Sequence, residues 1–223
     1  MNLVHENYLK TILSLELDGH PAAVSSLAES LSVKPASVTE MIKKLSAQKF
    51  LTHKKYKGFH LTAKGRKAAM QVLRRHRLWE TFLFQVLKYS WCEIHEEAEN
   101  FEHVMSARME QRIDKLLGFP KFDPHGHPIP SADGRLPQEY TEQHWVPLSL
   151  LSKGQQARVM MVSDEHPSFL NHLDMINLSL NSKVKIINKL EFDQSMELGF
   201  GNQQVFISRQ MADKIMVLIL NKD

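Results

Sequence analysis

The sequence predicts an α+β protein that begins with a winged helix-turn-helix, continues into a helical domain and ends in a small β-barrel. Three observations support this fold class. Residues 1–74 combine helical periodicity, a tight turn and a basic hairpin. Residues 75–145 hold two helices rich in histidine and glutamate, followed by a linker. Residues 146–223 alternate apolar and polar positions in short segments, as strands do. We therefore expect three domains with these boundaries.

The composition is that of an ordinary globular protein, with 43% hydrophobic and 24% charged residues among 223. No apolar run reaches the roughly 18 residues that a membrane-spanning helix needs. The first residues, MNLVHENYLK, lack the basic and then apolar layout of a secretion signal. A single cysteine, Cys92, excludes an internal disulfide framework and fits a reducing compartment. The sequence therefore predicts a cytoplasmic protein without a membrane partner.

The net charge of +3 conceals an uneven distribution. Residues 1–75 carry 13 Lys and Arg against 5 Asp and Glu, whereas the remaining residues carry 15 and 20. A strongly basic first third next to an acidic remainder indicates that the first third meets a polyanion.

The first domain reads as helices over residues 3–18, 24–31 and 34–51, followed by two short strands that turn at Lys57-Gly58. Gly19-His20-Pro21 breaks the first helix, and Ser26 and Glu29 have capping-box spacing in the second. Val38, Ile42 and Leu45 form the inward stripe of the third helix. This order predicts that the third helix enters the DNA major groove and that the hairpin lies on the phosphate backbone.

The outer face of the third helix and the hairpin supply the candidate DNA contacts. We expect Ser37 and Thr39 near base edges, with lysines on the phosphates and Pro35 in the first helical turn, where its missing N–H costs little. The complete predicted set is Lys34, Pro35, Ser37, Thr39, Lys43, Lys54, Lys55 and Lys57. A solvated charged turn in an unrelated small domain is the alternative.

Two later helices carry the candidate metal ligands. Thr62 is placed to cap a long helix through residue 87, and a second helix is predicted over residues 93–117. On the first, His76 and Glu80 stand one turn apart; on the second, His95, Glu99, Glu102 and His103 fall within an arc of about 100°. Facing stripes of imidazole and carboxylate suit a divalent first-row metal. Two solvated helix faces are the alternative.

The remaining residues predict a linker and a barrel. Residues 119–146 are rich in Pro, Gly and His and read as irregular. Five strand-like segments follow, and their spacing suggests a small five-stranded barrel. The segments are ARVMMVS, KVKIINKL, MELGF, QVFIS and IMVLIL.

Several short segments of the sequence resemble those of the diphtheria toxin repressor family, which includes iron-dependent repressors and manganese transport regulators. They are ENYLK, SVKPASVTEMIKKL, KYKGFHLTAKG, RHRLWE, HEEAENFEHVMS and GHPIP. The resemblance covers essentially the whole chain. It implies an SH3-like, FeoA-like barrel, a homodimer, a palindromic double-stranded operator and two metal sites per subunit.

By this resemblance, the ancillary site would use His76, Glu80, His95 and Glu165, with Ser168 as a poor further ligand. The primary site would use Glu99, Glu102, His103 and a residue of the first helix, which is Asn7 here. Relatives place an aspartate or methionine at that position, so Asn7 changes the charge of the site. Iron-responsive members carry cysteine where this chain has Glu99. The hard carboxylate of Glu99 therefore favours Mn²⁺ over Fe²⁺.

Together these expectations describe a metal-dependent DNA-binding repressor that senses Mn²⁺ or Fe²⁺ and controls metal-homeostasis genes. It would have no catalytic residues and no small-molecule substrate. Two other classes are considered: a winged-helix regulator of an organic ligand with a structural metal, and a di-metal carboxylate enzyme. The second lacks the Glu-x-x-His signature of ferritin-like sites.

Overall fold

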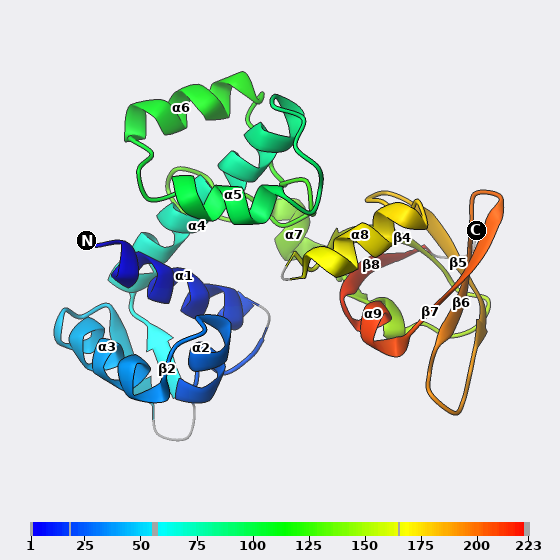
Figure 1. The fold of residues 1–223 in the computed structure, drawn as a ribbon, viewed down its shortest axis with the longest axis horizontal. Helices are drawn as coiled ribbons and strands as arrows, with labels where there is room; N and C mark the ends of the chain where they lie inside the picture. The colour runs from blue at the N-terminus through cyan, green and yellow to red at the C-terminus, as the bar shows by residue number, and fades with distance from the viewer. Residues whose placement is uncertain (1, 18, 55–57, 165, 221–223) are drawn as a thin grey trace. The chain divides into compact units, whose positions relative to one another are not determined.

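The computed structural model describes residues 2–17, 19–54, 58–164 and 166–220. These residues form two compact units (Figure 1). The first unit comprises residues 1–76, 99–111 and 130–135, and the second comprises residues 77–98, 112–129 and 136–223. None of the described helices is both long enough and apolar enough to cross a membrane.

The first unit contains three helices and a two-stranded hairpin. These are α1 (Leu3–Leu17), α2 (Val24–Ser30), α3 (Pro35–Ala47), β1 (Leu51–Lys54) and β2 (Gly58–Leu61), after which α4 (Ala63–Gln85) begins. The strands are antiparallel, with Leu51 opposite Leu61 and Lys54 opposite Gly58. Leu9, Leu13, Leu27, Val38 and Leu45 are fully buried between these elements. The predicted winged helix-turn-helix is confirmed.

Helix boundaries in this unit follow local capping. Pro35 occupies the first turn of α3, and the Thr62 hydroxyl accepts a hydrogen bond from Gly65 N at 3.0 Å, which caps α4 as the sequence predicts. The capping prediction for α2 was wrong. Ala23 precedes that helix, and Ser26 lies in its third position, where its hydroxyl accepts from Ala23 N at 3.0 Å. Ser26 therefore supplies only the return hydrogen bond of a capping box, because Ala23 has no side-chain acceptor.

Gly65 is required by packing between α4 and the start of the hairpin. A Cβ at this position would lie 2.1 Å from the carbonyl oxygen of Phe50. In an exposed helix, alanine is more stabilising than glycine by about 1 kcal/mol. Any loss of stability in Gly65→Ala must therefore come from this clash. We expect Gly65→Ala to lower the free energy of unfolding by roughly 1–3 kcal/mol in urea titrations. Lys67→Ala, on an exposed position of the same helix, is the control, and equal stability of both variants would contradict the packing argument.

The predicted single helix over residues 93–117 is interrupted. It forms α5 (Ile94–Phe101) and α6 (Ala107–Leu116), separated by a turn. Ser106 starts the second helix: its hydroxyl accepts from Met109 N at 3.2 Å and its carbonyl accepts from Glu110 N at 2.9 Å. Glu102 and His103 therefore lie just after the end of α5, and the predicted arc of four ligands on one helix was wrong for these two.

The second unit contains a six-stranded antiparallel sheet in the order β3-β8-β4-β5-β6-β7. The strands are β3 (Val146–Pro147), β4 (Gln156–Val162), β5 (Lys183–Lys189), β6 (Met196–Phe200), β7 (Gln203–Ile207) and β8 (Ile215–Leu220). All five predicted strands are present, and β3 is added. Register shifts in β4 and β5 bend the sheet, as expected for a small SH3-like domain.

Short helices accompany the sheet. They are a 3₁₀ turn (Leu148–Leu150), α8 (Pro167–Met175) and α9 (Arg209–Asp213), and α7 (Gln138–Glu142) precedes the first strand. Leu170 of α8 is fully buried, as are Val159, Ile186, Leu198 and Val217 of the strands. Alternate strand residues therefore supply one apolar face, which explains the period of two in the sequence.

The predicted irregular linker contains an ordered loop over residues 121–129. Ile129 N donates to Lys121 O at 2.8 Å, and Phe122 and Pro128 form an isolated bridge. Arg77 of α4 donates to the Pro128 carbonyl. The loop is therefore a hairpin-like element, and two of its polar side chains, Asp123 and His125, are buried.

Candidate metal centres and DNA-binding surface

The exposed face of α3 carries the predicted DNA contacts. Val38, Ile42 and Leu45 point into the core, so the intervening positions face solvent. Lys34, Pro35, Ser37, Thr39 and Lys43 are all exposed. In the hairpin, Lys54 ends β1, whereas Lys55 and Lys57 lie outside the described residues. An α3 face of this kind is able to meet bases and phosphates.

The first donor group centres on Glu102, whose side chain has no exposed surface. His76 of α4 and Glu99 of α5 each bring a ligand atom within 4.8 Å of it, and all three residues belong to the first unit. His76 Nδ1 lies 2.6 Å from Glu102 Oε2. Burial alone would raise the pKa of Glu102, but hydrogen bonding and charge from His76 and Lys10 more than offset this, and the pKa is lowered. Glu102 is therefore a buried anion.

Lys10 of α1 supplies a cation to the same carboxylates. Its Nζ lies 2.5 Å from Glu99 Oε1 and 2.8 Å from Glu102 Oε2, and its side chain is 11% exposed. The sequence analysis missed this residue, although ENYLK places it one turn after Glu6. The ammonium thus stands between the two carboxylates that were predicted to bind metal.

His103 connects this group to α1 through Glu6. Its Nδ1 lies 2.7 Å from Glu6 Oε2, which also faces Arg75 at 3.4 Å. His103 Nε2 and Glu102 Oε1 are 3.1 Å apart, yet both are buried without a hydrogen-bond partner among the described residues. The buried Oδ1 of Asn7 lacks one too, in the same part of the chain. Sequence analysis singled out Asn7 and missed Glu6.

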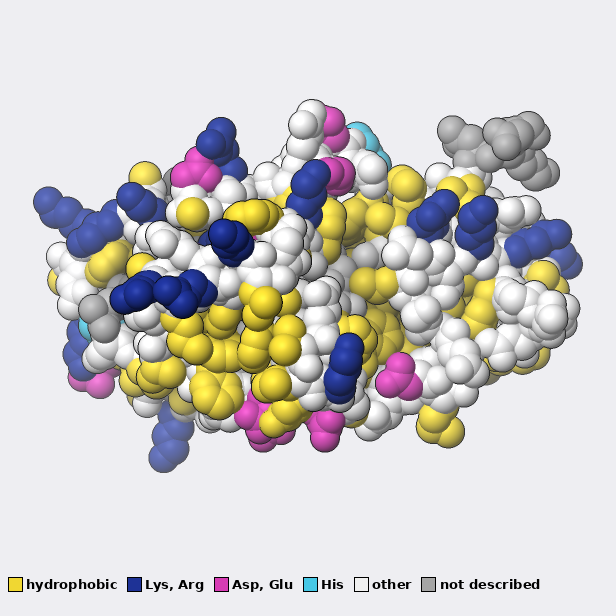
Figure 2. Space-filling model, turned by 90° about the horizontal axis from the view of Figure 1, so that it is seen from above, with side chains coloured by type: hydrophobic (Ala, Val, Ile, Leu, Met, Phe, Trp, Pro, Cys, Tyr) yellow, Lys and Arg dark blue, Asp and Glu magenta, His cyan; other side chains and the backbone are white. Residues whose placement is uncertain are grey.

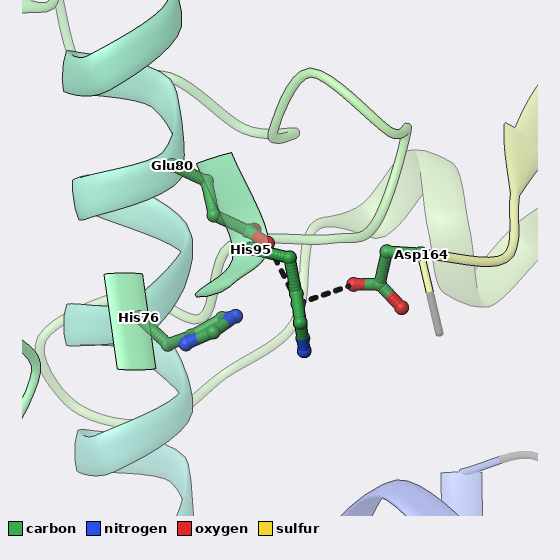
Figure 3. Close-up of side chains that lie close together, drawn as sticks. All are labelled: His76, Glu80, His95 and Asp164. Atoms are coloured by element: carbon green, nitrogen blue, oxygen red, sulfur yellow. Dashed lines mark hydrogen bonds and ion pairs between the residues drawn. The ribbon is translucent and has the colours of Figure 1, made fainter. Parts of the chain in front are cut away.

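The second donor group lies in the second unit. Glu80 of α4, His95 of α5 and Asp164, just after β4, each offer a ligand atom, all within 4.8 Å of one another (Figure 3). His95 Nδ1 is 3.2 Å from Glu80 Oε1 and 3.3 Å from Asp164 Oδ2.

The ionisable side chains of the second group shift one another's pKa values strongly. Desolvation opposes protonation of His95, but hydrogen bonds and charge from Asp164 and Glu80 outweigh it and raise the His95 pKa to about 11. The Asp164 pKa moves well below its usual range, since the charges of His127 and His95 overcome its desolvation. The predicted barrel ligand Glu165 lies outside the described residues. Ser168 is exposed on α8, and among the described residues of this segment Asp164 brings a carboxylate to the group.

A third donor group consists of Asp123, His125 and His127, each with a ligand atom within 4.8 Å of the others. All three come from the ordered loop that was predicted to be a linker. The D-x-H-x-H spacing in DPHGHPIP was the available signal, because alternate residues of an extended loop share a side. The Pro and Gly content of this segment favoured the irregular interpretation instead.

The donor chemistry of these groups fits a divalent metal. Imidazole nitrogen and carboxylate oxygen suit Mn²⁺, Fe²⁺, Co²⁺ and Zn²⁺. Buried polar atoms are normally hydrogen-bonded, so lone pairs left without a partner at Glu102 and His103 are consistent with a cation as the missing partner. The residues present therefore fit a metal ion at the first group on an observation independent of sequence likeness.

Three family models match successive parts of the chain. The iron-dependent repressor N-terminal DNA-binding domain matches residues 3–59, and the iron-dependent repressor metal-binding and dimerisation domain matches residues 62–131. A FeoA domain matches residues 146–218.

Curated relatives include the diphtheria toxin repressor of Corynebacterium jeikeium, 36% identical over 128 residues, which are 57% of this chain and 53% of the relative. The manganese regulator MntR of Geobacillus kaustophilus is 39% identical over 114 residues, which are 51% of this chain and 80% of the relative. The match therefore spans only about half the length of the diphtheria toxin repressor relative.

Solved structures match over nearly the whole chain. A manganese-dependent transcriptional repressor in complex with manganese superposes with a TM-score of 0.90 at 35% identity, covering 97% of this chain and 100% of that one. The manganese regulator SloR gives 0.82 at 30% identity, covering 97% and 98%. With a winged helix, a helical metal-binding region and a FeoA-type sheet in the same order, this chain belongs to the diphtheria toxin repressor family of metal-dependent regulators.

Proposed function

We propose that this protein is a transcriptional repressor that binds operator DNA as a homodimer when a divalent metal occupies its first donor group. The observation that carries the proposal is the position of Glu102. This buried carboxylate contacts Lys10 of α1 and His76 of α4, within the same compact unit as the exposed face of α3. A change of cation at Glu102 therefore acts directly on the helix that packs beneath the DNA-binding elements.

The proposed primary site uses Glu99, Glu102 and His103, with Asn7 or its neighbour Glu6 from α1. The ancillary site uses His76, Glu80, His95 and Asp164. We favour Mn²⁺ over Fe²⁺ because Glu99 supplies a hard oxygen ligand, and because the structural relatives include manganese-dependent repressors. When bound, the metal supplies a double positive charge that several carboxylates share.

The protein side of the switch follows from the contacts of α1. Glu6 holds His103, and Lys10 holds Glu99 and Glu102, so one helix contacts Glu99 of α5 and both predicted ligands in the turn that follows it. A metal held by Glu99, Glu102 and His103 would compete with the Lys10 ammonium for the two carboxylates, and so would bias the placement of α1 and the population of DNA-binding conformations. Because such coupling is reciprocal, operator DNA tightens metal binding by the same factor.

We further propose three domains, with boundaries at residues 74 and 145, and a homodimer in the cytoplasm that binds a palindromic operator. Support for an association surface comes from exposed apolar side chains after the middle of α4: Phe84, Val86 and Leu87 are 40–52% exposed. Figure 2 shows hydrophobic side chains at the surface in several places, with Lys and Arg side chains among them. Large exposed apolar patches mark interaction sites.

Fluorescence anisotropy with operator DNA selected from random sequence tests the proposal. We expect binding to strengthen by at least about fivefold on addition of Mn²⁺, the lower end of typical allosteric coupling, and to reverse with chelator. An anaerobic Fe²⁺ titration ranks the two metals. Equally tight binding in chelator would mean that the donor groups are structural and that the protein senses something else.

A further inference from the structure

We propose that Glu16 is the positioning residue through which α1 passes the state of the first donor group to the β1–β2 hairpin. The inference rests on the proposed metal-dependent binding of operator DNA and names the contact that carries it. Glu16 lies near the end of α1, and its side chain is only 13% exposed. The helix packs on β2 and joins the first donor group through Lys10 (Figure 1).

Helix geometry separates the two ends of α1. Glu16 follows Lys10 by six residues, which places it about 9 Å further along the axis and about 120° around it. One face of the helix therefore meets the donor group, and another meets the hairpin. A short helix that is displaced at one face shifts as a unit, so a bias at Lys10 reaches Glu16.

The first carboxylate oxygen of Glu16 holds the strand that leads into α4. Oε1 accepts a hydrogen bond from the Leu61 N–H at 3.2 Å, and His60 Nδ1 lies 3.4 Å from the same oxygen. A hydrogen bond to a carboxylate is roughly twice as strong as one between neutral groups. Leu61 is opposite Leu51 in the antiparallel pair, so a shift of the carboxylate is passed to both strands.

The second oxygen of Glu16 binds the first turns of α4. Oε2 forms an ion pair with Arg66, one turn after Thr62, whose hydroxyl caps the same helix. Glu16 thus contacts both sides of the junction between β2 and α4. Because its two oxygens have separate partners, a displacement of α1 acts on the strand and the helix together.

The hairpin has a further attachment that does not use Glu16. Phe59 N donates to Ala22 O at 3.1 Å, and the two residues form an isolated antiparallel bridge. Ile12 and Leu13 of α1 are fully buried in the apolar core. Loss of the Glu16 carboxylate therefore leaves the hairpin attached and removes the polar link between its strand and α1.

The placement of the hairpin matters for DNA binding. Lys54, a predicted phosphate contact, ends β1 opposite Gly58 of β2, so the position of β2 sets where this part of β1 lies. The alternative role for Glu16 is a purely structural ion pair. Its loss would then weaken operator binding equally with and without metal.

The coupling factor, which is the ratio of operator affinities with and without Mn²⁺, separates the two roles. It is measured by anisotropy with the full-length protein and the selected operator. For Glu16→Ala we expect this factor to fall by at least about twofold, the lower limit for residues that carry coupling between sites. Mn²⁺ affinity without DNA, measured by calorimetric titration, should be retained, because Glu16 is outside the donor groups. Operator DNA should then tighten Mn²⁺ binding by correspondingly less.

Two further variants sharpen the comparison. Glu16→Gln keeps an oxygen for the Leu61 N–H but loses the charge that faces Arg66, so its coupling factor should lie between those of Glu16→Ala and the wild type. Glu29→Gln makes the same change at an exposed position of α2 and should leave the factor unchanged. Circular dichroism and thermal unfolding establish that each variant folds, and Glu16→Gln decides the question if Glu16→Ala does not.

Three results would overturn the inference. One is an equal loss of operator affinity with and without Mn²⁺, which would make Glu16 a structural residue. Another is a wild-type coupling factor in the folded Glu16 variants. The third is a loss of Mn²⁺ affinity without DNA, which would place its effect at the metal site. Failure of the proposed repressor function is seen separately, because the wild-type protein itself would then show no response to Mn²⁺.

Discussion

Replacement of Glu102 by glutamine is expected to abolish metal-dependent operator binding. The carboxylate is fully buried and contacts Lys10, His76 and His103, so its loss removes both charge and ligand from the primary site. Even the outer partners of metal ligands are worth 10–100-fold in affinity, and a central ligand should be worth at least about 100-fold. The measurement is operator anisotropy at saturating Mn²⁺, compared with the metal-induced rise in melting temperature.

Glu97→Gln provides the matched control, because it makes the same chemical change on α5 outside the donor groups. Circular dichroism of both variants establishes that the fold persists. Retention of a wild-type response to Mn²⁺ by Glu102→Gln would exclude Glu102 from the switch. Loss of the response in Glu97→Gln as well would point to a nonspecific effect of charge.

Replacement of Lys10 by methionine is expected to destabilise the metal-free protein and strengthen Mn²⁺ binding. In the structure the ammonium lies 2.5 Å from Glu99 and 2.8 Å from Glu102, so removing it takes away a positive charge that two neighbouring carboxylates share. Removing one partner of a buried pair costs about 3 kcal/mol or more. A metal at these carboxylates no longer competes with the ammonium, so its affinity should rise by at least about tenfold, or roughly 1.4 kcal/mol.

Thermal unfolding with and without Mn²⁺ measures both effects, and calorimetric titration gives the affinity. Lys115→Met, on an exposed position of α6, controls for the loss of a positive charge. The expected signature is a lower melting temperature without metal and a larger rise with it. A lower Mn²⁺ affinity in Lys10→Met would instead mean that Lys10 supports the metal-bound state.

The sequence by itself determined the order of the elements and the identity of most donors. Helical periodicity and Pro35 predicted the position of α3, and the alternation of apolar and polar residues predicted the five main strands. The spacing of histidine and glutamate along two helices identified four of the donors, His76, Glu80, His95 and Glu99. These features are local: a helix or strand repeats its inward positions at a fixed interval, so one chain segment contains its own signal. The basic first third likewise pointed to a polyanion before any fold was known.

Tertiary structure alone decided which charges meet. Lys10 precedes Glu102 by 92 positions, and Glu6 precedes His103 by 97, so neither spacing nor periodicity could pair them. The same holds for Asp164, which joins Glu80 and His95 only through folding of the second unit. Asp123, His125 and His127 sit in a loop rich in Pro and Gly, whose order depends on Arg77, Trp91 and β4 as well as on hydrogen bonds within the loop. Periodicity reports a residue's own element, whereas a metal centre depends on contacts between elements, and only the packed chain fixes those.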